Sequence, residues 1–234
     1  MLVRALKRFY RALPCQCAVC HAWPAEAICQ VCLQRFAATL KRCNRCAMPL
    51  PSTPESQTCC QTCLLQPSQL DQTLAAVSYS YPWTTLLRDF KFHQATGWAR
   101  HFASLLRNTP GVHEALARAQ FLLPMPLSVN RLQSRGFNQT QLVAHALSPA
   151  KLHCGVLLRP FDRPAQSELT REQRLLNVRG AYTVALEKAR SLRGSRVVLL
   201  DDVMTSGASL EAAASVLRNA GVKHICALVI ARAE

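Results

Sequence analysis

Residues 196–209 constrain the fold more than any other stretch, because a buried strand, two acids and a hydroxyl-rich loop follow one another there. Residues 197–200 are apolar without a polar break, which is typical of a strand covered on both faces, as in a parallel sheet. Residues 210–220 place apolar side chains at helical spacing, and Gly221 follows as a common helix stop. This order predicts a strand, a loop and a helix of an α/β domain.

The polar residues of this stretch predict a ligand. Asp201 and Asp202 are expected directly after the strand, and open α/β sheets bind ligands beyond the carboxyl ends of their strands. A loop that enters a helix offers free backbone N–H groups and the positive end of the helix dipole, which suits phosphate. The acids repel phosphate but can accept hydrogen bonds from sugar hydroxyls, so we expect a ribose 5-phosphate site. The predicted phosphate-binding residues are Thr205, Ser206, Gly207, Ala208 and Ser209.

The same stretch resembles the signature with which type I phosphoribosyltransferases bind phosphoribosyl pyrophosphate (PRPP). The shared pattern is a hydrophobic strand, two acids, two apolar residues and Thr-Ser-Gly-x-Ser. The competing interpretation is a Rossmann-like strand and turn that carries two acids by chance. The resemblance implies a mostly parallel sheet with helices on both faces, and Mg²⁺ bound together with PRPP.

Composition restricts the location and the partners. The chain has 234 residues and a formal charge of +15, which favours anionic partners such as nucleotides, nucleic acid or anionic lipid, although a solvated basic surface is the simpler alternative. No apolar run reaches the roughly 18 residues of a membrane span, so a cytoplasmic protein is expected. Residues 1–14 form an amphipathic candidate that could lie on the inner membrane or dock on its own domain.

Four C-x-x-C pairs predict a zinc-binding module in residues 1–66, ahead of a phosphoribosyltransferase-like domain in residues 67–234. Cytoplasmic cysteines are more often metal ligands than disulfides, and four thiolates complete a closed structural zinc site. One or two Zn²⁺ ions are therefore expected, with the pairs combined in sequence or crosswise. Cys15 and Cys59 are spare, Cys59 could replace Cys60, and His21 is a weaker candidate. The predicted ligands are Cys17, Cys20, Cys29, Cys32, Cys43, Cys46, Cys60 and Cys63.

Three basic residues outside the loop are candidates for phosphate contacts. Lys91 lies between two phenylalanines and is either a phosphate contact or a solvated lysine. Arg131 and Arg135 are four residues apart, so on a helical turn they share a face. Two guanidinium forks on one face suit pyrophosphate. Further strands are expected at 75–81, 121–123 and 224–231, the last parallel to the strand before Asp201, and helices at 86–92, 97–107 and 138–147.

Two further motifs resemble the ComF family. Pro-x-Pro-Leu at 124–127 is followed by Arg-x-x-x-Arg-Gly-Phe-Asn-Gln at 131–139, and the segment 163–180 matches a third family pattern. With the cysteine pairs, the resemblance covers nearly the whole chain. It implies a zinc finger joined to a phosphoribosyltransferase-type domain, and an association with incoming single-stranded DNA and the DNA-uptake machinery. Serines occupy two loop positions where the family commonly has threonine, and both keep a hydroxyl. The matching residues of the third segment are Arg163, Gln166, Leu169, Arg174 and Asn177.

Two functions remain open at this point. In the first, the protein is an enzyme that transfers phosphoribose from PRPP to an acceptor for which the sequence shows no motif. In the second, it is a non-catalytic competence factor that binds single-stranded DNA and keeps the PRPP-binding fold as a scaffold or sensor. Arg163, Gln166, Arg174 and Asn177 are candidates for a mobile loop over the site or for nucleic-acid contacts.

Overall fold

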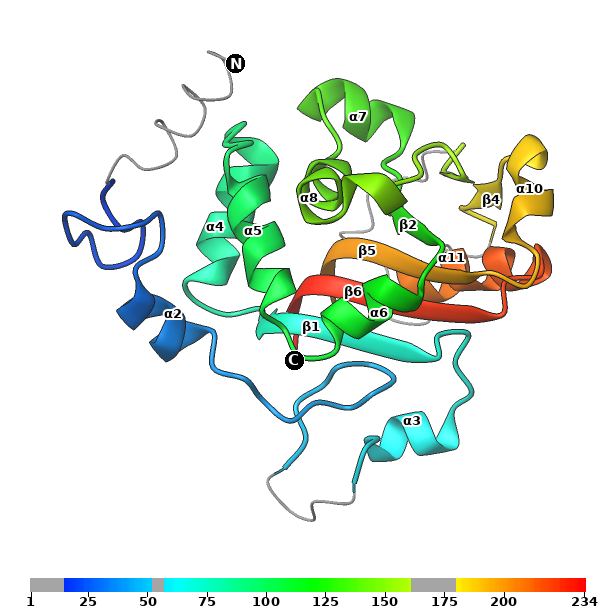
Figure 1. Ribbon diagram of the computed structural model, residues 1–234, viewed down its shortest axis with the longest axis horizontal. Coiled ribbons are helices and arrows are strands. Elements are labelled where there is room, and N and C mark those ends of the chain that lie inside the picture. The colour runs from blue at the N-terminus through cyan, green and yellow to red at the C-terminus, as the bar shows by residue number, and fades with distance from the viewer. Residues whose placement is uncertain (1–14, 52–56, 161–179) are drawn as a thin grey trace, which may run out of the picture. The chain divides into compact units, whose positions relative to one another are not determined.

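The computed structural model describes residues 15–51, 57–160 and 180–234, and it divides the chain into two compact units, Met1–Ala38 and Thr39–Glu234 (Figure 1). Cys43, Cys46, Cys60 and Cys63, which we call the second cysteine group, therefore belong to the larger unit. The boundary after residue 66 stays a prediction about which segments fold independently. The amphipathic stretch 1–14 and the candidates Arg163, Gln166, Arg174 and Asn177 lie outside the described residues.

A four-stranded parallel sheet forms the centre of the larger unit, as the unbroken apolar runs predict (Figure 1). Its strand order is β1-β6-β5-β2. The predicted parallel pairing of the last strand with the strand that carries the acids is confirmed. The strands are β1 (Gln72–Ser78), β2 (Phe121–Pro124), β5 (Arg196–Met204) and β6 (His224–Arg232).

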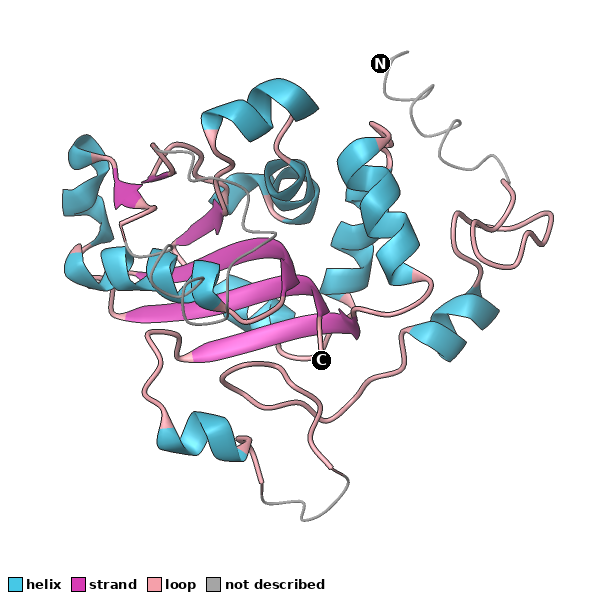
Figure 2. Cartoon of the chain, turned by 180° about the vertical axis from the view of Figure 1, so that it is seen from behind, coloured by secondary structure: helices cyan, strands magenta, loops and turns pink. Residues whose placement is uncertain are grey.

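Helices cover both faces of this sheet, which confirms the predicted α/β class (Figures 1 and 2). Side chains alternate along β5, so that Val197 and Leu199 belong to the same core cluster as Leu210 and Leu217 of helix α11. Helices α6 and α8 contact β5 from the other face. The helices of the larger unit are α3 (Gln61–Leu65), α4 (Trp83–Phe92), α5 (Trp98–Arg107), α6 (Val112–Arg118), α7 (Val129–Arg135), α8 (Gln139–Leu147), α10 (Leu186–Leu192) and α11 (Ala208–Asn219).

Two small elements complete the larger unit. Strands β3 (Leu157–Leu158) and β4 (Thr183–Val184) pair antiparallel, and the short helix η1 (Pro149–Lys151) precedes them. The larger unit therefore contains an antiparallel strand pair as well as the parallel pairs of the central sheet.

Among the described residues, no helix is both long enough and apolar enough to cross a membrane.

The second cysteine group covers the free edge of the sheet. The backbone N–H of Thr73 in β1 donates to the carbonyl of Asn44 at 2.7 Å, and its hydroxyl donates to the carbonyl of Arg45 at 2.6 Å. Arg42 donates to the Ser78 hydroxyl at 3.0 Å near the end of the same strand. An edge strand with unpaired backbone groups can pair with another chain and aggregate. Residues 42–45 occupy hydrogen-bonding groups along the β1 edge instead. The cysteine-rich segment is thus part of the packing of the larger unit.

Candidate functional site

The acid pair lies inside β5 rather than after it. The sequence predicted that Asp201 and Asp202 follow the strand, but pairing with β6 continues as far as Met204 opposite Arg232. Successive side chains of a strand point to opposite faces, so the two carboxylates face different neighbours. The two acids therefore have separate environments, and each is described by itself.

Asp202 is 5% exposed and is already hydrogen-bonded by two residues from the helices on its face of the sheet. The Lys91 ammonium of α4 lies 2.8 Å from Oδ1, and the Gln139 amide of α8 donates to Oδ2 at 2.6 Å. The other amide atom, Oε1 of Gln139, accepts from Arg135. Lys91, which is predicted to be either a phosphate contact or a solvated lysine, forms an ion pair with this acid, and its contact with phosphate stays a prediction. A continuous polar chain links Asp202 to Arg135.

Asp201 lies on the opposite face and is partly buried. Burial, followed by the neighbouring charge of Asp202, raises its pKa to about 7. The backbone N–H of Asp202, which donates to Oδ1 at 2.9 Å, opposes this rise, as do the charges of Lys91 and Arg159. The guanidinium of Arg159 lies 5.5 Å from the centre of the Tyr182 ring, and burial raises the pKa of that phenol. A carboxyl group that titrates near neutrality can accept or release a proton at physiological pH.

Three predicted basic residues gather in one recess of about 420 Å³, which we call the cationic recess. Arg131 and Arg135 come from α7, and Gly136, with a φ of +80°, ends that helix. The Arg135 guanidinium lies 5.3 Å from the centre of the Phe92 ring, which is 65% exposed. The residues that line the recess are Lys91, Phe92, Gln94, Arg131, Ser134 and Arg135. The recess combines positive charge with an exposed aromatic face.

The predicted phosphate loop connects β5 to α11. Thr205 and Ser206 are exposed, whereas Gly207 and Ala208 are buried and Ser209 is partly buried. Gly207 has a φ of +81° at the start of α11, and a Cβ atom there would lie 2.5 Å from Cε of Met204. The left-handed φ favours glycine at this position. The first turn of the 12-residue helix leaves backbone N–H groups beside the two exposed hydroxyls.

Three residues at this site were not predicted as site residues. Gln139 is the last residue of the Arg-Gly-Phe-Asn-Gln motif, and that motif was the available signal for it. Asn138 caps α8 by accepting from the N–H groups of residues 140 and 141, which orients Gln139 toward the sheet. Arg159 and Tyr182 flank the segment 161–179 that the structure does not describe. Arg159 begins the arginine-rich stretch 159–179, whereas no local pattern marked Tyr182.

The eight predicted cysteine ligands form two groups of four, so the pairs combine in sequence and not crosswise. The four Sγ atoms of each group lie within 4.8 Å of one another. Cys20 and Cys29 are 3.6 Å apart, and Cys46 and Cys60 are 3.7 Å apart. Tetrahedral zinc with Zn–S bonds of about 2.3 Å needs sulfur atoms roughly 3.8 Å apart, so both groups fit Zn²⁺. The groups are Cys17, Cys20, Cys29 and Cys32, and Cys43, Cys46, Cys60 and Cys63; Cys15, Cys59 and His21 belong to neither.

The two cysteine groups repeat the same local geometry. Cys17 accepts from the N–H of Cys29, and Cys43 accepts from the N–H of Cys60, both at 3.3 Å. Cys29 begins helix α2 (Gln30–Phe36) of the smaller unit, as Cys60 begins α3. Burial opposes ionisation of Cys17 and Cys43, but backbone N–H groups outweigh it and lower both pKa values to about 6. Thiolate is the form that binds metal, so each group contains one cysteine that is already largely ionised near neutral pH.

Comparisons with known proteins find sequences and a solved structure to which this chain is similar. The phosphoribosyl transferase domain family matches residues 126–234. Competence protein F of Haemophilus influenzae is 28% identical over 216 residues, covering 89% of this chain and 91% of that protein. Competence protein ComFC of Bacillus subtilis is 28% identical over 210 residues, covering 85% of this chain and 80% of that protein. A solved allosteric regulatory enzyme of purine biosynthesis is 15% identical with a TM-score of 0.37; the match covers 57% of this chain and 25% of that one.

Proposed function

This chain belongs to the ComF family and carries a phosphoribosyltransferase domain, and we propose that it binds PRPP together with Mg²⁺. The observation that supports this most strongly is the junction of β5 and α11. There Asp201 and Asp202 lie near the C-terminal end of a buried parallel strand, and Gly207 opens a helix whose first turn is flanked by exposed Thr205 and Ser206. Acceptors for sugar hydroxyls thus stand next to donors for a phosphate.

The cationic recess would hold the pyrophosphate of PRPP. Lys91, Arg131 and Arg135 line it, and Lys91 is at the same time the partner of Asp202. When PRPP enters, its negative charge would compete with Asp202 for Lys91, and the released carboxylate would be free for Mg²⁺ or a ribose hydroxyl. Bound Mg²⁺ would supply neutralisation of the pyrophosphate charge. Thr205 to Ser209 would bind the 5-phosphate.

The proposed reaction is the transfer of a phosphoribosyl group to an acceptor nucleophile. The nucleophile forms a bond to C1′ of the ribose while the C1′–O bond to pyrophosphate breaks, and pyrophosphate leaves with the bonding electrons. The nucleophile gives up a proton, for which Asp201, with a pKa of about 7, is a suitable acceptor. Arg131 and Arg135 would stabilise the charge of the leaving pyrophosphate.

Calorimetry of PRPP binding tests this function, with and without Mg²⁺. We expect micromolar affinity for the wild type and loss of binding in Asp201→Asn/Asp202→Asn. The matched control is Glu114→Gln/Glu187→Gln, which removes the same charge from two exposed positions and should bind as the wild type does. If the wild type fails to bind PRPP with Mg²⁺ present, the proposal is wrong. If the wild type binds PRPP but shows no pyrophosphate exchange with any base, the site binds PRPP as a sensor and does not catalyse transfer.

The second proposed function is binding of single-stranded DNA, in support of natural transformation. The formal charge of +15 supports it, as do the names of the two relatives, which are competence proteins. The exposed ring of Phe92 beneath Arg135 offers one surface for base stacking beside phosphate-binding cations. In this proposal the protein acts in the cytoplasm with the DNA-uptake machinery, and residues 1–14 hold it near the inner membrane.

Salt dependence of oligonucleotide binding tests the second function. Affinity should fall steeply as salt rises, because binding releases counterions from the strand. Phe92→Ala should weaken binding by about 1–3 kcal/mol at every salt concentration, as expected for loss of one stacking surface. Leu186→Ala, at a residue that is 90% exposed on α10, is the control for removal of an exposed apolar side chain. Affinity that does not respond to salt would contradict this function.

A further inference from the structure

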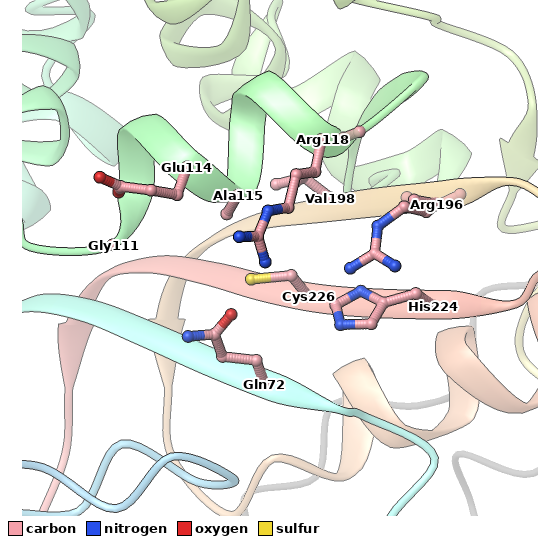
Figure 3. A pocket seen from close by; sticks show the side chains of 11 residues that line it. Gln72, Gly111, Glu114, Ala115, Arg118, Arg196, Val198, His224 and Cys226 are labelled. Carbon is pink, nitrogen blue, oxygen red and sulfur yellow. The ribbon is translucent and has the colours of Figure 1, made fainter.

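A second pocket lies at the opposite end of the sheet from the proposed PRPP site. It has a volume of about 260 Å³ and is bounded by α6 and by the first residues of β1, β5 and β6 (Figure 3). Because the pocket is lined by residues 196–198 and β5 ends at Met204, roughly 20 Å of strand separate this pocket from the phosphate loop. Its polar lining consists of Gln72, Glu114, Arg118, Arg196, His224 and Cys226. None of these residues belongs to the proposed PRPP site.

Two arginines supply positive charge to this pocket. Arg118 reaches from α6 and Arg196 from β5, and both guanidinium groups point toward β6 (Figure 3). Over residues 15–51, 57–160 and 180–234, neither arginine forms an ion pair with a carboxylate. Glu114 points away from both guanidinium groups. Nε of Arg196 is buried and has no hydrogen-bond partner within the described part of the chain, which leaves a donor unsatisfied.

The floor of the pocket adds neutral hydrogen-bonding groups. Burial, followed by the positive charges of Arg196, Arg218 and Arg118, lowers the pKa of His224, with Asp71 opposing this effect. An imidazole kept neutral in this way still offers one N–H donor. Next to it on the same face of β6, burial raises the pKa of the Cys226 thiol to about 12, so this group also keeps its proton. The amide of Gln72 faces them from β1 (Figure 3).

We propose that this pocket binds a small phosphomonoester. The two negative charges of the phosphate match the two guanidinium groups of Arg118 and Arg196, whose forks suit phosphate oxygens. The terminal guanidinium nitrogens of the two arginines can donate to phosphate oxygens, and the His224 imidazole can donate to a further oxygen. Ala115 and Val198 line the same pocket and provide apolar contact for the organic part of the ligand. The volume limits the ligand to a small metabolite.

The test follows the imidazole signal of His224 by NMR, assigned through its loss in His224→Gln. Inorganic phosphate and glycerol 3-phosphate are the probes, added to the full zinc-loaded protein. Both should shift this signal with saturation and raise the pKa of His224, because the bound anion offsets the neighbouring positive charges. Arg118→Gln, at an exposed helical position where folding is not at risk, should raise the dissociation constant about tenfold.

Two control variants separate this pocket from other phosphate-binding sites. Arg190→Gln/Arg193→Gln removes two exposed positive charges from α10 and its end without touching the pocket, and should leave both titrations unchanged. Thr205→Val/Ser206→Ala changes the phosphate loop and should also leave the His224 signal responsive. The proposal is overturned if neither probe moves the signal, if Arg118→Gln responds as the wild type does, or if only an oligonucleotide or succinate moves it.

Discussion

The guanidinium of Arg232 joins the backbone of Cys46 to the loop that follows β5, although Cys46 and Arg232 are 186 residues apart in the sequence. Its Nε donates to the carbonyl of Cys46 at 2.7 Å, and Nη1 donates to the carbonyls of Met204 at 3.1 Å and Thr205 at 2.6 Å. The side chain is 7% exposed. A ligand of the second cysteine group and the start of the phosphate loop are thus held by one buried cation.

Loss of this bridge should destabilise the protein. Arg232→Met removes the guanidinium donor from the carbonyls of Cys46 and Thr205, whereas the carbonyl of Met204 still accepts from the N–H of Ala233. The cost is about 1–3 kcal/mol for a group left unsatisfied. For a chain of this size we expect the melting temperature of the zinc-loaded protein to fall by roughly 5–10 °C. Arg100→Met, at an exposed position of α5, is the control and should change it little. Equal melting temperatures for both variants would show that the bridge contributes nothing measurable.

Zinc content should distinguish the adjacent residues Cys59 and Cys60. Of these two residues, only Cys60 belongs to a four-cysteine group, so Cys60→Ser should weaken one site and leave the other intact. We expect two Zn²⁺ per wild-type chain in metal analysis, two in Cys59→Ser, and one retained against a chelator in Cys60→Ser. Two ions retained by Cys60→Ser and one by Cys59→Ser would mean that Cys59 is the ligand.

The pKa of Asp201 predicts how stability depends on pH. The folded-state pKa, about 7, lies above the ordinary value of 3.8, so the folded protein holds this proton more tightly than the unfolded chain. The stabilisation is therefore present at low pH and is lost as pH rises from about 4 through 7. Asp201→Asn cannot ionise, so its stability relative to the wild type should increase between about pH 5 and pH 8. Unfolding measured across this range checks the sign.

Asp71→Asn is the matched control for that experiment. Burial alone would raise the pKa of Asp71, but the N–H of Ile225 and the guanidinium of Arg218 outweigh it and lower the pKa. A lowered pKa gives a contribution that is present above the ordinary value and lost only as pH falls below it. Asp71 also raises the pKa of His224, so the difference between Asp71→Asn and the wild type should be constant only above about pH 7, where this imidazole is neutral in both proteins. A slope above pH 7 would attribute the effect to another group.

Glycine at position 207 should be required for stability as well as for ligand approach. Gly207→Ala places a side chain in the left-handed region and 2.5 Å from Cε of Met204, so we expect a loss of about 1–2 kcal/mol in the free energy of unfolding. Gly97→Ala is the control, because Gly97 has a φ of −55° and nothing lies within 4 Å of the added atom. It should be neutral or stabilise by about 0.4–1 kcal/mol. A tolerated Gly207→Ala would contradict the required glycine.

Elements were more predictable than their ends. The strand expected at 75–81 is Gln72–Ser78, and the strand expected to end before the acids continues to Met204. Both differences arise because backbone pairing with β6 sets where each strand begins and ends, and that pairing joins residues far apart in the sequence. The helix expected at 138–147 matches Gln139–Leu147 closely, since Asn138 is a local cap.

The sequence alone determined the features that depend on a few neighbouring residues. Apolar runs specified buried strands, and two-residue spacing brought pairs of thiols together. The order of strand, acids and glycine-containing loop predicted a ribose-phosphate site, which stays a prediction. Only the tertiary structure decided which cysteine pairs combine, that Lys91 and Gln139 bind Asp202 while Asp201 faces elsewhere, and that Arg118 and Arg196 share a pocket. These relationships depend on how strands and helices distant in sequence pack against one another, which local spacing does not encode.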